Sequence, residues 1–130
     1  AKREKQADAV VKQLNRLSAA GYATFVIGDL NDWDPIVPDA DASEEATPTS
    51  QALKKMKNYV AGGDDELVNS LKWVEPIEKR YTYNYKGSKT VLDHILLPLG
   101  WQDRVSKVTI DHDRPDGASD HWPVILYLSW

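Results

Sequence analysis

The sequence predicts an α/β fold, in which helices cover a sheet. Residues 2–20 carry apolar side chains at helical spacing, and Gly21 stands where a glycine commonly ends a helix. Residues 23–30 follow as a continuous apolar run rich in β-branched side chains, which is typical of a strand buried on both faces. An amphipathic helix that leads into a buried strand is the pattern of an α/β protein.

A proline-containing loop and a second helix come next. Residues 31–48 hold three prolines and six acids, so we expect an exposed loop there. Thr49 or Ser50 can cap a short helix that runs through Ala61 and stops at two glycines. Residues 65–74 are ambiguous, and their apolar spacing suggests a short helical turn.

The rest of the chain predicts strands. Residues 80–97 predict a hairpin, because an alternating strand (80–85) and a buried strand (90–97) flank the turn at 86–88. Two further strands are predicted at 105–110 and 123–129, and a polar loop at 111–120 lies between them. No repeat or linker divides the sequence, so we expect one unit over residues 1–130.

Composition and charge narrow the classes of function. The 130 residues include 16 basic and 20 acidic side chains, a net charge of −4, and no cysteine. The missing cysteine excludes disulfides, thiolate metal sites and a cysteine nucleophile. No apolar stretch reaches the ~18 residues that span a bilayer. The charge argues against a broad cationic face for nucleic acid. Six of the acids lie within residues 31–46, however. The rest of the chain holds 16 basic and 14 acidic residues, so its net charge is +2.

Polar residues that follow apolar strands are the first places to look for chemistry, because open α/β sheets bind ligands there. Asp29 and Asn31 end the first strand, and strand alternation would put both on the same side of the chain. The carboxylate can take a proton from water, and the amide can hold that water or an oxyanion. A strand-ending turn, in which Gly, Asp and Asn are common, explains the same residues without any chemistry.

Two further acids occupy similar positions. Asp93 and His94 lie inside an apolar strand and face opposite ways, so they cannot both line one pocket. A buried Asp93 needs a partner, and a structural ion pair or hydrogen bond explains it as well as function does. We expect His94 alone to be structural. Asp120 and His121 precede the last strand, where a hard oxygen ligand for Mg²⁺ or Mn²⁺ stands beside a side chain suited to phosphate contact or proton transfer. Alternatively, these two residues form a capped loop with a chance histidine.

Taken in order along the chain, these pieces resemble the endonuclease/exonuclease/phosphatase superfamily, whose fold is DNase I-like. The matching segments are Ile27-Gly28-Asp29-Leu30-Asn31-Asp32, Tyr81-Thr82-Tyr83, Leu92-Asp93-His94-Ile95-Leu96 and Ser119-Asp120-His121-Trp122-Pro123-Val124. With the leading helix, they cover nearly the whole chain. The hairpin before the third segment is similar to that of bacterial, often secreted, nuclease-like members, so we expect a secreted or periplasmic location.

The resemblance implies a Mg²⁺- or Mn²⁺-dependent phosphoesterase that cleaves phosphodiester bonds, with nucleic acid as the leading substrate. By analogy, Asp29 would activate or position the attacking water, and Asn31 would help to hold water and phosphate. Asp120 would bind the metal. His121 would contact the scissile phosphate, and Asp93 would orient and charge that histidine. A lipid or inositol phosphate hydrolase, and a non-catalytic binding or assembly module, are the alternative functions. Ca²⁺ is an alternative metal, for example in a loose site on the acidic loop, although a solvated loop is the default expectation there.

The family domain is a four-layer α/β sandwich with mainly antiparallel or mixed sheets flanked by helices, and this chain resembles its C-terminal half. The Asn and the metal-binding Glu that the first half usually supplies cannot be identified here, so we expect little or no activity from the chain alone. The N-terminal half, or a homodimer partner, would then be needed. The face that meets it would carry exposed apolar side chains. We expect them among Phe25, Ile27, Leu92, Ile95 and Val124.

Overall fold

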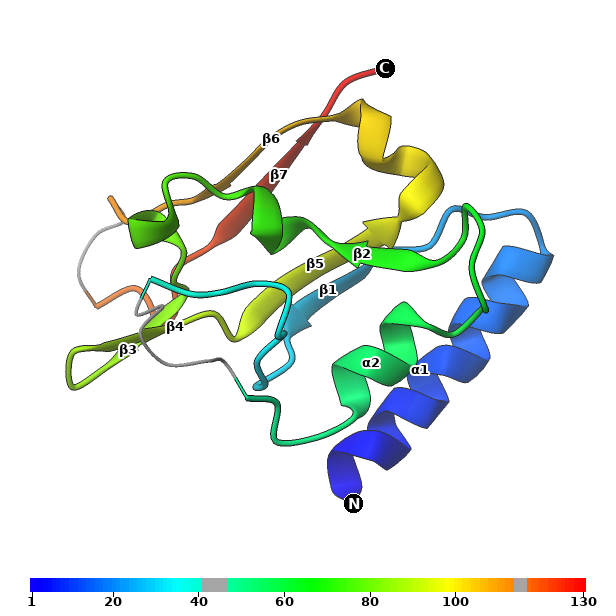
Figure 1. Ribbon diagram of the computed structural model, residues 1–130, viewed down its shortest axis with the longest axis horizontal. Helices are drawn as coiled ribbons and strands as arrows, with labels where there is room; N and C mark the ends of the chain where they lie inside the picture. Colours follow the sequence, from blue (N-terminus) through cyan, green and yellow to red (C-terminus); the bar gives the residue numbers. More distant parts are fainter. Residues whose placement is uncertain (41–46, 114–116) are drawn as a thin grey trace.

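The largest sheet of the protein lies between two helices on one side and a β-hairpin on the other (Figure 1). The computed structural model describes residues 1–40, 47–113 and 117–130. The predicted α/β fold is confirmed, because the strands pair antiparallel and helices flank the sheet. Among the helices in these ranges, none combines the length and apolar character needed to cross a membrane.

The two α-helices pack together on one face of the sheet. The first, α1 (Lys2–Ala19), ends where Gly21 takes φ +88° and its N–H binds the Ser18 carbonyl at 3.0 Å. Glycine adopts a positive φ at little cost, so the predicted helix end is confirmed. The second, α2 (Ala52–Lys57), is shorter than predicted. The chain leaves the helical conformation at Asn58, which takes φ −105° and ψ 31°, and both the backbone N–H and the side-chain amide of Asn58 donate to the Lys54 carbonyl, at 3.1 and 3.0 Å.

The main sheet has three strands in the order β1–β5–β2. Strands β1 (Val26–Asp29) and β2 (Leu67–Asn69) pair with opposite edges of the central strand β5 (Asp93–Pro98). The helical turn predicted over residues 65–74 is therefore wrong at its start, where the chain pairs with β5 instead. Its second part is helical: the Asn69 side chain accepts a hydrogen bond from the Leu71 N–H at 3.1 Å and begins a 3-10 helix, Ser70–Trp73.

Two hairpins and two short helices complete the part of the chain that the structure describes. β3 (Tyr83–Tyr85) pairs with β4 (Ser88–Thr90), and β6 (Val105–Ile110) pairs with β7 (Val124–Leu128). The short helices are of the 3-10 type and span Ile77–Lys79 and Leu99–Arg104.

The strand predicted over residues 90–97 is divided in two. The chain leaves β4 after Thr90, and β5 begins only at Asp93. The Thr82 hydroxyl oxygen accepts hydrogen bonds from the N–H groups of Leu92 and Asp93, at 3.0 and 3.2 Å, and so holds the bend between the two strands. Because of this bend, the hairpin at β3–β4 is separate from the main sheet.

Apolar clusters cover both faces of β5. On one face, Leu96 packs with side chains of α1, α2 and β2. On the other face, Ile95 packs with Val37, with Leu71 of the 3-10 helix Ser70–Trp73, and with the inward side of β6–β7. Successive residues of a strand point to opposite faces, so this single strand joins the two halves of the core.

The predicted exposed apolar face is only partly present. Ile27 is 68% exposed, as expected, while Phe25 and Val124 are half-buried. The prediction is wrong for Ile95, which is 5% exposed because β6–β7 and the 3-10 helix cover it. It is also wrong for Leu92, which is 8% exposed and whose carbonyl binds the Leu30 N–H at the end of β1.

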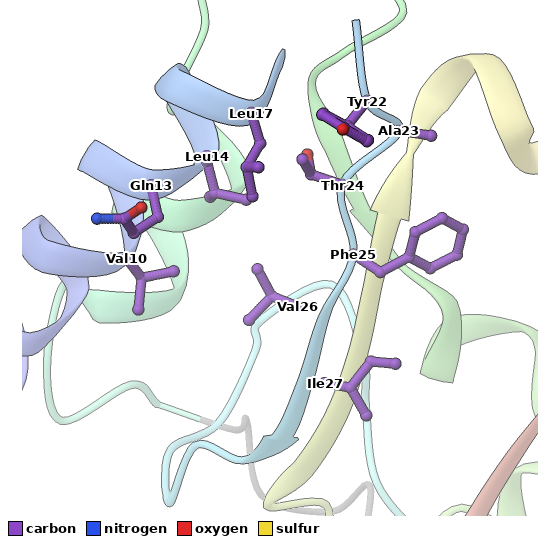
Figure 2. Close-up of a pocket in the computed structure, with 10 residues that line it drawn as sticks. All are labelled: Val10, Gln13, Leu14, Leu17, Tyr22, Ala23, Thr24, Phe25, Val26 and Ile27. Atoms are coloured by element: carbon purple, nitrogen blue, oxygen red, sulfur yellow. The ribbon is translucent and has the colours of Figure 1, made fainter. Parts of the chain in front are cut away.

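An apolar groove separates α1 from the outer edge of β1 (Figure 2). Its volume is about 470 Å³, and its walls include Val10, Leu14 and Leu17 of α1 together with Val26 of β1. Among the described strands, β1 pairs only with β5, so its second edge carries no strand partner.

The acidic loop after β1 is folded onto the protein, and the prediction of a solvated loop is wrong for its first part. Asp32, Asp34 and Asp39 are all 6% exposed or less. The Asp32 carboxylate accepts hydrogen bonds from the Thr49 N–H at 2.7 Å and from the Ser50 hydroxyl at 2.6 Å. These partners lie 17 and 18 residues away in the sequence, so local patterning could not reveal them.

Asp34 is buried with a cation. Both of its carboxylate oxygens lie 2.8 Å from the Lys57 ammonium, and the Asn69 amide donates to one of them at 3.1 Å. The carboxylates of Asp32 and Asp34 are thus bound to groups of the protein itself, which argues against the alternative of a loose Ca²⁺ site on these residues. The remaining acids of the segment, Asp41, Glu44 and Glu45, lie outside the described residues.

Candidate active site

Two carboxylates face each other across the central pair of strands. β1 and β5 are aligned so that Asp29 lies directly opposite Asp93, and Gly28 opposite His94. Residues directly opposite in an antiparallel pair share one face, so Asp29 and Asp93 lie together while His94 points to the other face. Like charges in this arrangement repel each other, which makes a hydrogen-bond donor or a cation between them favourable.

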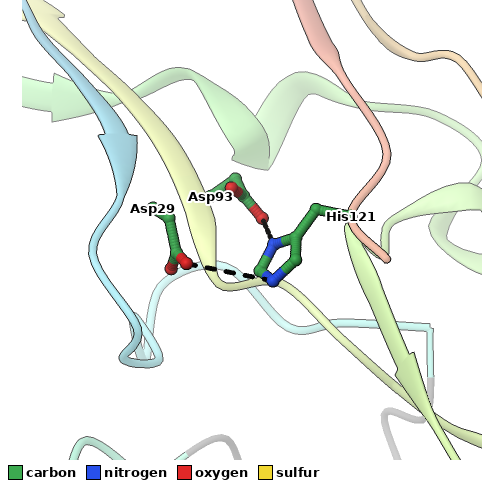
Figure 3. A group of neighbouring side chains, drawn as sticks. All are labelled: Asp29, Asp93 and His121. Atoms are coloured by element: carbon green, nitrogen blue, oxygen red, sulfur yellow. Dashed lines mark hydrogen bonds and ion pairs between the residues drawn. The ribbon is translucent and has the colours of Figure 1, made fainter. Parts of the chain in front are cut away.

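His121 supplies that donor (Figure 3). Its Nδ1 atom lies 2.7 Å from Asp93 Oδ2, and its Nε2 atom lies 3.8 Å from Asp29 Oδ2. The side chains of His121 and Asp93 are 24% and 20% exposed, and that of Asp29 is 49% exposed. The imidazole therefore stands between two carboxylates in a row that opens to solvent at Asp29. We call these three side chains the Asp–His row.

Contacts with the β3 segment hold His121 in place. His121 forms an isolated β-bridge with Tyr83, and the neighbouring Trp122 N–H binds the Thr82 carbonyl at 2.8 Å. The His121 N–H donates to the Ser119 hydroxyl at 3.1 Å, which gives Ser119 a supporting place in the loop.

Thr82 aligns both members of the Asp93–His121 pair. Its carbonyl binds the residue after His121, and its hydroxyl binds the Asp93 N–H. Sequence reasoning did not single out Thr82 as a site residue. The signal was present, since Tyr81-Thr82-Tyr83 is one of the segments that carry the family resemblance.

The carboxylates around His121 favour its charged form. The Nδ1 atom must carry a proton, because the Asp93 oxygen can only accept. Partial burial disfavours the imidazolium, but the hydrogen bond to Asp93 and the negative charges of Asp93, Asp29 and Asp120 outweigh it. Together they raise the pKa of His121 above its ordinary value. The imidazolium thus persists to a higher pH than in a free histidine.

Asn31 and Asp120 lie at the margin of the Asp–His row. β1 ends at Asp29, and Asn31 takes φ +49° with its N–H bound to Asp29 Oδ1 at 2.9 Å. The extended chain that would align the Asn31 side chain with Asp29 is absent at this turn, so the argument from strand alternation is wrong there. Asp120 is exposed and close enough to His121 for its charge to act on the imidazole.

His94 has structural partners, as predicted. It is 1% exposed, with Nδ1 2.8 Å from the Asn69 amide nitrogen and Nε2 2.8 Å from the Asp32 carbonyl oxygen. Because the amide donates and the carbonyl accepts, the proton of the neutral ring sits on Nε2. Burial lowers the pKa of His94 below its ordinary value, although the Asp32 carbonyl and the charges of Asp34 and Asp93 oppose this.

The Asp–His row offers carboxylate ligands for a metal ion, whereas the protonated ring of His121 has no lone pair to donate. One ligand atom each from Asp29, Asp93 and His121 lie within 4.8 Å of one another. Carboxylate oxygens suit the hard cations Mg²⁺ and Mn²⁺. Asp93 Oδ2 is engaged by His121, so the half-exposed carboxylate of Asp29 is the oxygen donor that is more open to an ion. Asp120, the predicted metal ligand, is not part of this group.

The architecture defined by these strands and helices is a mixed α/β fold that is also found in a solved structure. A solved structure that shares it is a 3'-5' exonuclease (NExo) from Neisseria meningitidis, with a TM-score of 0.72 and 21% sequence identity. The similarity covers 98% of this chain and 53% of the exonuclease chain, so this chain spans about half the length of that protein. No protein-family model matches the sequence, and no curated protein matches it.

Proposed function

We propose that this chain carries the hydrolytic site of a divalent-metal-dependent phosphodiesterase that acts on nucleic acid, and that it belongs to the endonuclease/exonuclease/phosphatase superfamily. The observation that carries the proposal is the hydrogen bond of 2.7 Å between His121 Nδ1 and Asp93 Oδ2, which leaves Nε2 directed toward the open side of the site near Asp29. The order of the motif segments and the nuclease-type fold support the same assignment.

The imidazole of His121 would contact the scissile phosphate. The carboxylates that raise its pKa keep a proton on Nε2, and a charged donor at that atom stabilises the negative charge that develops on phosphate oxygens. Asp93 would orient the ring through Nδ1. Asp29 would position the attacking water and accept its proton, and the backbone N–H of Asn31 donates to that carboxylate at 2.9 Å.

The metal would bind on the solvent side of the Asp–His row. The exposed side chain of Asp120 would bind the ion. The half-exposed carboxylate of Asp29 is open to the same solvent side and could bind it as well. Bound Mg²⁺ or Mn²⁺ supplies Lewis-acid stabilisation of phosphate oxygens. The net charge of −4 is compatible with such a substrate, because three buried acids of the loop after β1 are enclosed by the fold.

We further propose that residues 1–130 form the C-terminal half of a larger four-layer domain. The support is that the chain matches 53% of the exonuclease chain, and that Ile27 is 68% exposed beside the unpaired edge of β1. An N-terminal half, or a second copy of this chain, would cover this region and complete the site. The chain alone would then have little or no activity.

The direct test is hydrolysis by the longest natural form of the protein. DNA, RNA, sphingomyelin and inositol phosphates would be assayed with Mg²⁺, with Mn²⁺ and with a chelator. We expect nucleic acid to be cleaved, the chelator to abolish cleavage, and His121→Ala to reduce it about 10²- to 10⁴-fold, the usual contribution of a positioned proton donor.

The matched control is His112→Ala, which removes the imidazole that binds the Tyr81 carbonyl at 2.9 Å, outside the Asp–His row. This variant should retain activity. Full activity of His121→Ala would show that the proposed site is wrong. Cleavage of only the lipid or inositol phosphates would replace nucleic acid as the substrate, and binding without turnover of any substrate would leave a non-catalytic module. Normal turnover by the isolated 130-residue chain would refute the proposal that a second half is needed.

A further inference from the structure

A row of aromatic rings leads away from the Asp–His row along the β3–β4 hairpin. The Tyr83 ring lies 4.9 Å from the His121 ring, measured between centroids, and the two residues also share a β-bridge. Tyr85 follows two positions later, so its side chain is on the same face of β3. Its ring is 6.5 Å from that of Tyr83, with an angle of only 11° between the planes.

The outer ring of this row is presented to solvent. Tyr85 is 58% exposed, whereas Tyr83 is half-buried against His121. The hairpin extends away from the two helices (Figure 1), so α1 and α2 do not cover it. A single exposed tyrosine is common on protein surfaces. Here, however, the ring continues a series of ring contacts that begins at the proposed catalytic histidine.

The hairpin is also locally cationic. Residues 81–92 contain two lysines and no acid, in a chain of net charge −4. The Lys86 ammonium lies 5.3 Å from the centre of the Tyr85 ring, and the Lys89 ammonium lies 4.9 Å from that of Tyr81. Positive charge beside an aromatic face is the combination that binds both the phosphates and the bases of a single strand.

The turn that carries Lys86 has a defined conformation. Lys86 and Gly87 take φ +50° and +89°, and the Asn84 side chain accepts a hydrogen bond from the Gly87 N–H at 2.9 Å. Two successive positive φ angles are characteristic of tight hairpin turns. A surface that is already ordered loses less entropy when a ligand binds.

From these contacts we infer that the β3–β4 hairpin binds single-stranded nucleic acid, with a base stacked on Tyr85 and a neighbouring phosphate next to Lys86. A single strand is the favoured form, because bases in a duplex already stack on each other and do not offer their faces. The bound strand would continue past Tyr83 to His121. This inference rests on the proposed function and adds how the substrate is held.

The chain provides a matched control for Tyr85. Tyr127 on β7 is 43% exposed and has the Lys107 ammonium 5.2 Å from its ring centre, so the same pair of residue types occurs there. Tyr127 lies near the end of β7, in the β6–β7 hairpin, away from the β3–β4 hairpin. Tyr83 stacks with Tyr85 and not with Tyr127. Tyr85→Ala and Tyr127→Ala thus remove similar groups from two different surfaces.

Binding would be measured by fluorescence anisotropy with labelled single-stranded oligomers in a chelator, so that no hydrolysis is required. Oligo-dT, oligo-rU and an abasic oligomer of equal charge form the three arms. We expect Tyr85→Ala to raise Kd for oligo-dT or oligo-rU at least about fivefold, the lower end of the stacking range for one base. Tyr127→Ala and Tyr85→Phe should bind as the wild type does, and the abasic oligomer should bind more weakly and show no effect of Tyr85→Ala.

The charge is tested separately. Lys86→Ala should reduce the slope of log K against log salt by about 1, while Lys107→Ala should leave the slope unchanged. Circular dichroism of each variant checks that the fold is retained. Equal Kd values for Tyr85→Ala and Tyr127→Ala would overturn the inference, as would equally tight binding of the abasic oligomer.

The two proposals can fail independently. Tyr85→Ala should still raise Kd about fivefold in the chelator when it is made in the His121→Ala background, because that background leaves Tyr85 and Lys86 in place. Loss of binding in Tyr85→Ala supports the inference even if no nucleic acid is cleaved with metal present. Cleavage of nucleic acid that is unaffected by Tyr85→Ala at low substrate concentration overturns the inference and leaves the proposed function intact.

Discussion

Replacing Asp93 by asparagine tests whether a charged His121 is what holds the site together. At pH 5.5 the imidazolium donates to the Asp93 carboxylate at 2.7 Å, with both side chains less than a quarter exposed. A hydrogen bond between charged groups contributes roughly 1.5–3 kcal/mol. We therefore expect Asp93→Asn to lower the free energy of unfolding by about 2 kcal/mol at this pH.

The loss should become smaller as the pH rises. The raised pKa of His121 means that its contribution is complete below its unfolded value, about 6.5, and is lost as the pH passes the folded value. Once the pH exceeds the folded pKa of His121, the condition for which pH 9 is chosen, the neutral ring no longer offsets the charges of Asp29 and Asp93, which lie opposite each other. Removing one of them relieves that repulsion, so the expected loss is below about 1 kcal/mol.

Urea unfolding followed by tryptophan fluorescence at the two pH values measures both quantities, and NMR titration of His121 should show a lower pKa in the variant. The control is Asp8→Asn, which breaks an exposed ion pair of 2.6 Å with Lys55. It should cost no more than about 1 kcal/mol, equally at both pH values. Equal losses for Asp93→Asn at pH 5.5 and 9, or an unchanged titration of His121, would refute the electrostatic account of the site.

Three further outcomes are expected. Burial lowers the pKa of His94, so the free energy of unfolding should fall as the pH drops below about 6.5, where the unfolded histidine takes up its proton. His94→Asn should show a shallower fall between pH 7 and 5 in urea unfolding, and a steeper one would contradict the assignment. Lys57→Met should cost about 3 kcal/mol, because it leaves the Asp34 carboxylate buried without its cation. Lys55→Met should cost about 1 kcal/mol or less, and similar losses for the two lysine variants would argue against a buried ion pair. Asp120→Asn should weaken Mn²⁺ binding about tenfold or more, measured by water proton relaxation, and unaltered binding would exclude Asp120 as a ligand.

Local patterning was sufficient where local physics determines the structure. The amphipathic spacing of residues 2–20 and the glycine after them correspond to α1, which buries Ala7 and Leu14. Strand alternation also separated Asp93 from His94, and the structure places them on opposite faces of β5. In both cases the period of the backbone alone decides which side chains share a face.

Patterning failed where partners come from distant parts of the sequence. Asp32 and Asp34 occur in a proline-containing acidic segment, and only the folded chain shows that residues 49, 50, 57 and 69 enclose them. β2 is three residues long, and its apolar residues fit a helical turn equally well. The contact between Asp93 and His121 spans 28 residues and depends on the bend at Thr82, so the motifs suggested the pair but could not supply its geometry.

The alignment of β1 with β5 determines the interior and the site at the same time. A slip of one residue would turn every side chain of β5 to the other face. His94 would lose Asn69 and the Asp32 carbonyl, and Asp93 would enter the apolar interior without a partner. Misaligned molecules would therefore be both unstable and without an Asp–His row. A mutation at another position that preserves the alignment of β1 with β5 also keeps Asp29 and Asp93 opposite each other, so the same strand pairing determines stability and site geometry.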